Sequence, residues 1–392
     1  MNHVLKEAIW MKIIIAPDSF KESLSALEAA DAIERGFTSV FPDADYRKLP
    51  MADGGEGTVQ SLVDATNGSI VDQVVTGPLG EPVEAFFGML GDGKTAVIEM
   101  AAASGLHLVP VEKRNPLVTT TKGTGELITA ALDAGAERLI IGIGGSATND
   151  GGAGMIQALG GRLLDESGRE IGPGGGALSQ LASIDVSGLD PRIHQVKLEV
   201  ACDVDNPLTG PRGASAVFGP QKGATDDMVR VLDQHLTHFA DVAEKALGTT
   251  FRETEGAGAA GGLGWSLLAF LHADLKRGID IVLEAVDFEN EVQDADLVIT
   301  GEGRIDSQTI YGKTPIGVAK AAKSYDVPII GIAGSISRDS DAVYQHGIDA
   351  LFSIVPGAVP LEDAFEHAAE YMERTARDIA ASIKLAKTMF LI

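Results

Sequence analysis

The sequence has a single cysteine, Cys202, few aromatic residues and no long apolar run. One cysteine excludes an intramolecular disulfide and a zinc-thiolate site, and it is typical of a reducing compartment. Aromatic residues make up only 5% of the chain, which argues against a surface that stacks bases or sugars. A spanning helix needs about 18 consecutive apolar residues, and none is present. Residues 1–10 lack the features of a signal peptide, so we expect an extension with no role in the fold and a cytoplasmic protein.

The chain also lacks any excess of basic residues, because its formal net charge is −25 and its pI is about 4.6. Such a protein repels the nucleic-acid backbone and anionic membrane surfaces. An anionic substrate could bind only where local cations, backbone N–H groups or a metal ion reverse the field. The few basic residues beside glycine-rich loops are therefore informative.

The two ends of the chain share one pattern, in which short β-branched strands alternate with helices. A length of 392 residues favours two domains. The expected N-terminal elements are a strand at Lys12–Ala16, a helix from Leu24 to Phe37, a strand at Asp45–Met51 and a helix from Thr58. The expected C-terminal elements are strands at Leu297–Thr300, Pro328–Ile332 and Leu351–Val355 and a long helix from Leu361 to Ala386. This alternation is typical of a parallel sheet.

The middle of the chain has a different pattern. Turn dipeptides separate the strands Ser69–Gly77, Val83–Leu90 and Thr95–Met100, which indicates antiparallel or mixed structure. Two single strands follow at Arg138–Ile143 and Lys197–Ala201. We therefore predict an α/β protein with a Rossmann-like or flavodoxin-like parallel-sheet domain formed by both chain ends. The predicted domains are residues 11–70 with 290–392, and an inserted α/β domain of mixed sheet at residues 71–289.

Several of the predicted strands end in loops rich in Gly, Asp, Ser and Asn. These loops are 17–21, 52–57, 144–152, 202–207 and 301–306. Ligands bind beyond the carboxyl ends of the strands in open parallel sheets. Glycines let backbone N–H groups wrap an anion, and carboxylates can hold Mg²⁺ or accept a proton. Any one loop has a plain alternative as a helix cap or turn, but together they favour phosphoryl transfer.

Two nucleotide-binding patterns do not fit their required context. Gly88–Thr95 satisfies the P-loop pattern, yet a strand rather than a helix is predicted to follow. Gly256–Gly261 fits the dinucleotide fingerprint but follows no buried strand. Gly142–Ala147 does follow a strand and has Asp165 about twenty residues later. An NAD-dependent hydroxy-acid oxidoreductase that uses this loop is the alternative function, and a non-catalytic small-anion binding protein is a third.

Taken together, the loops resemble those of the type-1 glycerate kinase family of bacteria. The stretches that carry the resemblance are 16–24, 51–58, 144–152, 203–208, 256–264 and 300–306, within a likeness that runs from Met11 to about residue 385. The resemblance implies an ATP-dependent transferase of organic acid metabolism that phosphorylates D-glycerate at the 2-hydroxyl to give 2-phosphoglycerate and ADP. It also implies Mg²⁺, a site in the cleft between the domains, and no nucleic-acid or membrane partner. A homodimer is compatible with it.

The resemblance does not settle the roles of single residues, so we assign these from their chemistry. Asp203 is the expected general base, and Lys21 the cation that faces a carboxylate or phosphate. The expected substrate-binding residues are Asp18, Ser19, Lys21, Asp53, Gly54, Gly55, Asp205, Asn206 and Arg304. Nucleotide or phosphate binding is expected from Gly144, Gly145, Ser146, Thr148, Asn149, Gly301, Gly303 and Lys313. The candidate Mg²⁺ ligands are Asp53, Asp306 and Glu302.

Overall fold

The computed structural model describes residues 11–390, and the expected extension at residues 1–10 lies outside this range. The chain divides into two compact units, described separately below. Unit 1 holds the described residues up to Asp53 and from Val282 onward, and unit 2 is Gly54–Ile281. The predicted domain boundaries lie near residues 70 and 290. The first boundary lies earlier because the helix that begins at Thr58 packs on strands of unit 2.

Unit 1 is built on a five-stranded parallel sheet. Its strands are β1 (Lys12–Pro17), β2 (Asp45–Lys48), β11 (Leu297–Ile305), β12 (Ile329–Ile336) and β13 (Ala350–Ser353). Its helices are α1 (Ala26–Thr38), α10 (Phe288–Val292), α11 (Thr314–Lys323), α12 (Leu361–Glu366) and α13 (Ala368–Phe390). The strand order is β13-β12-β11-β1-β2, and all neighbours are parallel. This is the flavodoxin-like order, so the predicted fold class is confirmed.

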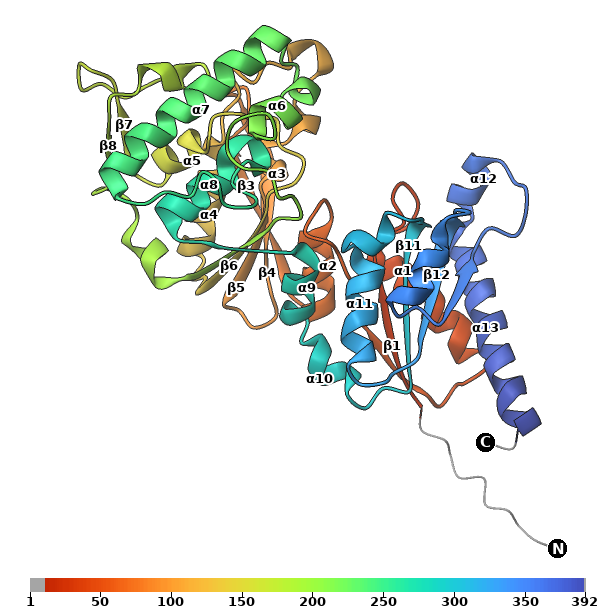
Figure 1. The fold of residues 1–392 in the computed structure, drawn as a ribbon. Helices are drawn as coiled ribbons and strands as arrows, with labels where there is room; N and C mark the ends of the chain where they lie inside the picture. The colour runs from red at the N-terminus through yellow and green to blue at the C-terminus, as the bar shows by residue number, and fades with distance from the viewer. Residues whose placement is uncertain (1–10, 391–392) are drawn as a thin grey trace, which may run out of the picture. The chain divides into compact units, whose positions relative to one another are not determined.

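Segments from opposite ends of the chain lie side by side in unit 1 (Figure 1). β1 pairs with β11, and the Thr300 hydroxyl donates to the Ala16 carbonyl at 2.9 Å across 284 positions of sequence. α1 and α13 pack together over one face of the sheet, in the core that includes Ile33 and Met372. The connections from β1 to its two neighbours run in opposite directions. The carboxyl ends of β1 and β11 are therefore the switch point where this fold binds ligands.

Local signals account for the start of unit 1. The strand β1 is buried over most of its length, as its run of isoleucines requires. Ser25 caps α1: its hydroxyl oxygen accepts the Glu28 N–H, while the Glu28 side chain accepts the Ser25 N–H. The capping box sets the start of α1 at Ala26, whereas the apolar periodicity alone predicts a start at Leu24.

Unit 2 contains a six-stranded mixed sheet and a two-stranded antiparallel sheet. The strands of the larger sheet are β3 (Ser69–Thr76), β4 (Pro82–Met89), β5 (Thr95–Glu99), β6 (Arg138–Gly142), β9 (Lys197–Ala201) and β10 (Asp274–Lys276), and those of the smaller sheet are β7 (Arg162–Leu164) and β8 (Ser183–Asp185). The helices are α2 (Thr58–Thr66), α3 (Ala101–Ser104), α4 (Lys122–Asp133), α5 (Ala153–Ala158), α6 (Ala214–Phe218), α7 (Asp226–Leu247) and α8 (Ala259–Leu271). The division between the units falls within α9 (Gly278–Ala285). The order of the sheet is β10-β9-β6-β5-β4-β3.

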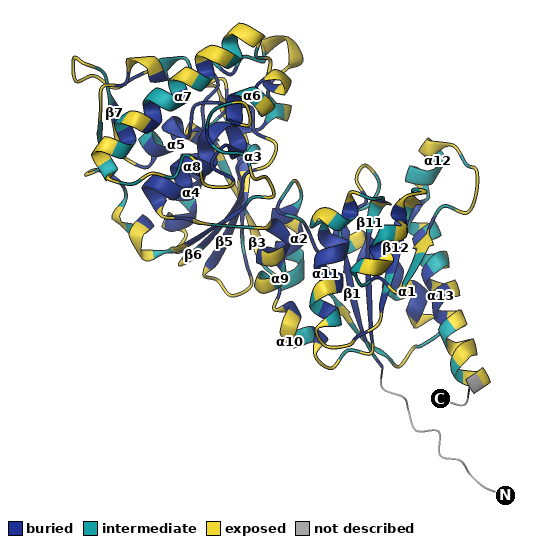
Figure 2. Ribbon diagram, in the orientation of Figure 1, coloured by how far each residue is buried: buried dark blue, intermediate teal, exposed yellow. Residues whose placement is uncertain are grey.

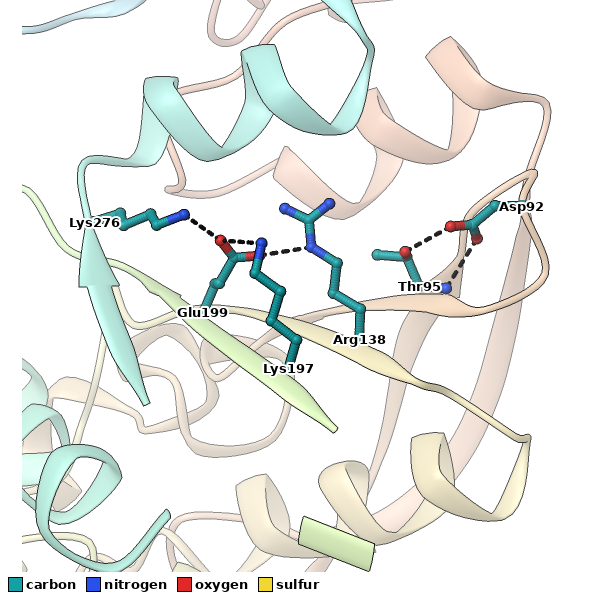
Figure 3. Close-up of polar contacts among 6 residues, drawn as sticks. All are labelled: Asp92, Thr95, Arg138, Lys197, Glu199 and Lys276. Carbon is teal, nitrogen blue, oxygen red and sulfur yellow. Dashed lines mark hydrogen bonds and ion pairs between the residues drawn. The ribbon is translucent and has the colours of Figure 1, made fainter. Parts of the chain in front are cut away.

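The sheet of unit 2 is mixed, as the turn dipeptides predicted. β3, β4 and β5 are antiparallel, whereas β5, β6, β9 and β10 are parallel. The buried colouring of β5 and β6 marks the centre of the sheet (Figure 2). In the tight turn between β4 and β5, Asp92 accepts the Thr95 hydroxyl at 2.7 Å (Figure 3). Thr95 thus begins a strand, so Gly88–Thr95 is not a P-loop.

Several predicted elements have other bounds in the structure, among them the strand predicted at Asp45–Met51, which ends at Lys48. β11 continues through Gly301, Glu302 and Gly303 to Ile305, and β12 continues to Ile336, because the two strands keep their parallel pairing beyond the predicted ends. The segment that begins at Gly301 is therefore strand rather than loop. The predicted long C-terminal helix is two helices that part at His367.

A fully buried carboxylate joins three strands of unit 2. Glu199 on β9 accepts from Arg138 on β6 at 2.6 Å, and it pairs with Lys197 at 3.0 Å and with Lys276 on β10 (Figure 3). Burial by itself would raise the pKa of Glu199, but the hydrogen bonds from Lys276, Lys197 and Arg138 lower it to about 2. The cluster fastens the edge strand β10 to the centre of the sheet.

Within residues 11–390, none of the helices has both the length and the apolar composition needed to span a bilayer.

Candidate functional site

The switch point of unit 1 places a half-buried carboxyl group directly after β1. Asp18 accepts the Ser19 N–H at 2.6 Å and the Thr314 hydroxyl at 2.5 Å. Thr314 is the first residue of α11, so this helix starts beside the carboxyl group. Burial raises the pKa of Asp18 to about 6, against the hydrogen bonds from Thr314 and Ser19, and the charge of Asp53 raises it further.

A second half-buried carboxyl group belongs to the neighbouring strand. Glu302 on β11 accepts the Thr309 hydroxyl at 2.8 Å, and the Lys313 ammonium lies 3.8 Å from it. Burial raises the pKa of Glu302 to about 7; the Thr309 bond and Lys313 oppose this, and the charges of Asp18 and Asp53 add to it. Thr309 also accepts the N–H of Asp306 at 3.2 Å. One hydroxyl therefore links two of the predicted metal-binding residues.

The three carboxyl groups of Asp18, Asp53 and Glu302 form the carboxylate cluster of unit 1. Their mutual repulsion shows in the raised pKa values of Asp18 and Glu302. Among residues 11–390, no three His, Cys, Asp or Glu side chains are arranged to hold a metal ion by themselves. Mg²⁺ is usually bound by one or two carboxylates together with water and substrate phosphates. Oxygen-rich, mutually repelling groups of this kind fit such a shared ion, because a divalent cation would offset their charge.

Cationic residues come from the same strand ends as this cluster. Lys21 is exposed, and its backbone nitrogen lies 3.6 Å from the position that a Cβ on Gly303 would take. The Arg304 guanidinium lies 3.2 Å from Asp306. Gly301 has a packing reason of its own, since a Cβ there would lie 2.0 Å from a carbonyl oxygen of β12. Gly301 therefore lies in a strand rather than in the predicted loop, and its part in phosphate binding stays a prediction.

The β6 loop, defined as residues 144–152, follows the carboxyl end of β6 in unit 2. Gly145 has a φ of +72°, and Gly144 lies beside Gly55, with 3.8 Å between the ideal Cβ of one and the Cα of the other. In the described part of the chain, the backbone N–H groups of Gly144, Gly145 and Ser146 have no hydrogen-bond partner. Successive N–H groups of this kind are anion-binding features. The Gly54-Gly55 turn packs against the same end of the sheet.

The second half of the β6 loop faces inward. Thr148 and Asn149 are fully buried, and the Asn149 amide donates to the Ser215 hydroxyl at 2.9 Å. Thr148 Oγ1 and Asn149 Oδ1 have no partner among the described residues. The buried Asp150 accepts the Thr121 N–H at 2.8 Å and hydroxyl at 2.9 Å, and burial raises its pKa. Thr148 and Asn149 are thus placed to support the loop from behind.

The glycine-rich tract 256–264 also supports the β6 loop. Gly261 accepts the Gly151 N–H at 3.0 Å, and a Cβ on Gly261 would lie 2.0 Å from the Thr148 oxygen. Only glycine permits this approach. The tract therefore serves packing, and its match to the dinucleotide fingerprint is coincidental.

Asp203 follows β9, and its carboxylate accepts the N–H of Gly278, the first residue of α9, at 3.1 Å. Asp205 forms an exposed ion pair with Arg212 at 2.8 Å, and the Asn206 amide donates to the Arg212 carbonyl at 2.8 Å. Asp203 thus satisfies a helix N-terminus, while Asp205 and Asn206 order their own loop.

The structure groups the predicted site residues by unit. Unit 1 brings together the predicted residues of the β1 and β11 ends, and unit 2 those of the β6 and β9 ends. Three residues that contact the predicted site residues were not predicted from the sequence. Thr309 donates to Glu302, Thr314 donates to Asp18, and the Lys222 ammonium donates to the β6 loop. Thr314 had a signal, because the following Pro315 marks a helix start. Lys222, beside an ordinary Pro-Gln pair, had none.

The alternative function required Gly142–Ala147 to open a helix. Instead, Ser146 forms a β-bridge with Gly105, and the next helix, α5, begins only at Ala153. The dinucleotide-binding interpretation therefore fails.

Comparison with known proteins agrees with the chemistry of the site. A sequence profile described as the glycerate kinase family matches residues 13–384. A glycerate kinase of Bacillus subtilis (strain 168) is 90% identical over 97% of this chain and 100% of its own length. A glycerate 2-kinase of Escherichia coli (strain K12) is 60% identical over 96% of this chain and 98% of its own length. A crystal structure from Salmonella typhimurium LT2, described as a candidate glycerate kinase 2, superposes with a TM-score of 0.91 at 58% identity, covering 97% of this chain and 100% of that one.

Proposed function

The chain belongs to the glycerate kinase family, a family of ATP-dependent phosphotransferases, and we propose that it phosphorylates D-glycerate at the 2-hydroxyl to give 2-phosphoglycerate and ADP. The observation that carries the site assignment is the carboxylate cluster beside the start of α11 at the switch point of unit 1. The regiochemistry is supported by the resemblance of the loops and by the name of the Escherichia coli relative, which is 60% identical.

The carboxylate cluster supports a role for Mg²⁺. Asp18, Asp53 and Glu302 are the residues that would hold the ion, and Asp306, tied to Glu302 through Thr309, would orient them. When bound, the ion would neutralise phosphate charge as the phosphoryl group is transferred. Lys313 and Arg304 supply fixed positive charge at the same strand end, which would offset the charge that develops on the phosphoryl oxygens. Lys21 would face the carboxylate of glycerate.

The β6 loop is the proposed site for the phosphates of ATP. The N–H groups of Gly144, Gly145 and Ser146 can donate to phosphate oxygens, since no protein group in the described chain accepts them. Thr148 and Asn149 would hold the shape of the loop from inside. Gly301 and Gly303 are strand residues: Gly301 lets β12 approach closely, and both are kept as proposed contacts of the phosphates.

Asp203 is the proposed general base for the attacking hydroxyl. Asp203 follows the carboxyl end of β9, and β9 pairs with β6, the strand that precedes the β6 loop. The Gly278 N–H donates to one oxygen of the Asp203 carboxylate, and this hydrogen bond fixes the orientation of the whole carboxylate group. Gly54, Gly55, Asp205 and Asn206 are kept as proposed substrate contacts of the same strand ends.

An assay that couples ADP formation to NADH oxidation tests the activity directly. The purified chain should consume ATP only when D-glycerate and Mg²⁺ are both present, and EDTA should stop it. Phosphorus NMR of the product should show 2-phosphoglycerate; 3-phosphoglycerate would contradict the regiochemistry, and binding without turnover would leave only an anion-binding protein. The proposed cytoplasmic location rests on the use of ATP and the single cysteine, and light scattering tests the proposed homodimer.

A further inference from the structure

Lys222 is a lysine in an unusual place. It ends the short 3₁₀ helix Pro220–Lys222 and is 1% exposed, although lysine is almost never fully buried without a charged partner. Its ammonium donates to the Ser146 hydroxyl oxygen and to the Thr148 carbonyl, both at 2.7 Å. Both bonds go to the β6 loop.

The charge of Lys222 is not neutralised by a direct ion pair in residues 11–390. The opposite charge that acts on it is Asp150, whose carboxylate accepts from Thr121 and from the N–H groups of Gly152 and Gly154. Burial lowers the pKa of Lys222 to about 7, partly countered by Asp150. A buried cation held by two neutral acceptors is costly for the fold. A phosphate anion on the β6 loop would supply the missing negative charge.

The contact with Ser146 has a directional consequence. A lysine ammonium has donors only, so Ser146 Oγ must accept from it. The hydroxyl proton of Ser146 is then aimed elsewhere, and no acceptor for it is present among the described residues. The Ser146 hydroxyl thereby joins the N–H groups of Gly144 and Gly145 as a donor of the loop.

We infer that Lys222 is a positioning residue for the nucleotide phosphates: it fixes the β6 loop with its donors outward and polarises the Ser146 hydroxyl toward a phosphate oxygen. The inference rests on the proposed function, because it takes the β6 loop as the site of the ATP phosphates. Lys222 acts from behind the loop and does not touch the nucleotide.

A double-mutant cycle tests this role through binding, independently of turnover. Calorimetry with the ATP analogue AMP-PNP and Mg²⁺ gives Kd for the wild type, Lys222→Met, Ser146→Ala and the double variant. Hydrogen bonds to a charged group contribute enough that each single change should raise Kd about tenfold to a hundredfold. Because Lys222 and Ser146 share one hydrogen bond, the two effects should not multiply, and the double variant should bind no more than about threefold worse than the weaker-binding single variant. KM for ATP should rise accordingly, with KM for glycerate changed less than about threefold.

Controls separate this inference from a structural role and from failure of the proposed function. Lys245→Met, at an exposed site in the last turn of α7, should leave Kd unchanged. If Lys222→Met does not fold, Lys222→Gln, which keeps donors but not charge, replaces it in the cycle. The inference is overturned if the Lys222 variant lowers only the melting temperature with Kd within twofold of wild type, or if the two effects multiply. A wild type that binds AMP-PNP but does not phosphorylate glycerate would refute the proposed function alone.

Discussion

Asp203 can be tested in a way that separates catalysis from helix capping. The structure shows its carboxylate accepting the Gly278 N–H at 3.1 Å, so the residue already has a structural role at the start of α9. Asparagine keeps an acceptor oxygen at the same place and satisfies helix N-termini about as well as aspartate. Asp203→Asn should therefore change the free energy of unfolding by only a few tenths of a kcal/mol.

Loss of a general base has a much larger effect on rate. The kcat of Asp203→Asn should fall about 10²- to 10⁴-fold, equivalent to about 3–5 kcal/mol in the barrier. Asp203→Ala should show the same loss of rate and, in addition, about 1 kcal/mol less stability, because the helix N–H loses its acceptor. The coupled assay at saturating ATP, glycerate and Mg²⁺ measures the first effect, and urea unfolding measures the second.

A matched control removes a cap where no chemistry is proposed. The Thr225 hydroxyl caps α7 by accepting the Met228 N–H at 3.3 Å. Thr225→Ala should lose about 1 kcal/mol of stability with kcat unchanged. If Asp203→Asn keeps kcat within about threefold of wild type, Asp203 is a cap only, and the base must be sought among Asp18 and Glu302.

Three further predictions follow from the geometry. The pKa values of Asp18 and Glu302 are raised above 3.8 and 4.5, so their contribution to stability is complete at low pH and is lost as pH rises through about 6 to 7. Melting curves from pH 5 to 8 should show this loss, and Mg²⁺ and Glu302→Gln should each reduce it. If neither changes the dependence of the melting temperature on pH, the assignment is contradicted. Glu199→Gln should cost about 1–3 kcal/mol in urea unfolding, since it removes the buried charge that the partly exposed Arg138, Lys197 and Lys276 share, and a cost under about 0.5 kcal/mol would show that the cluster is dispensable. Gly301→Ala should prevent correct folding, whereas Gly303→Ala, whose Cβ would meet only ordinary contacts at 3.5 Å, should give a folded protein by circular dichroism; equal tolerance of both would refute the close approach.

The prediction of the fold succeeded where a local pattern has one interpretation. The isoleucines of Lys12–Ala16, the apolar period of the first helix and the turn dipeptides between β3, β4 and β5 each fix an element by themselves. It failed at Gly301–Gly303, where glycine signals a loop in isolation. The pairing of β11 with β12 overrides that signal, because the close backbone of the neighbouring strand itself demands glycine.

The sequence by itself determined the class of chemistry. Carboxylates and glycines at strand ends, in an acidic chain with one cysteine, indicate a phosphotransferase rather than a disulfide-stabilised or nucleic-acid-binding protein. These signals are local, since each needs only a strand and the residues that follow it.

Only the tertiary structure decided which groups meet. The strand order puts Asp18 next to Glu302 and Thr314, nearly 300 positions away, and burial at that point raises both carboxyl pKa values. The packing of unit 2 likewise brings the Lys222 ammonium into contact with the β6 loop, although Lys222 and Ser146 are 76 positions apart in the sequence. Proximity and desolvation arise from the packing of distant segments, and no spacing along the chain encodes them.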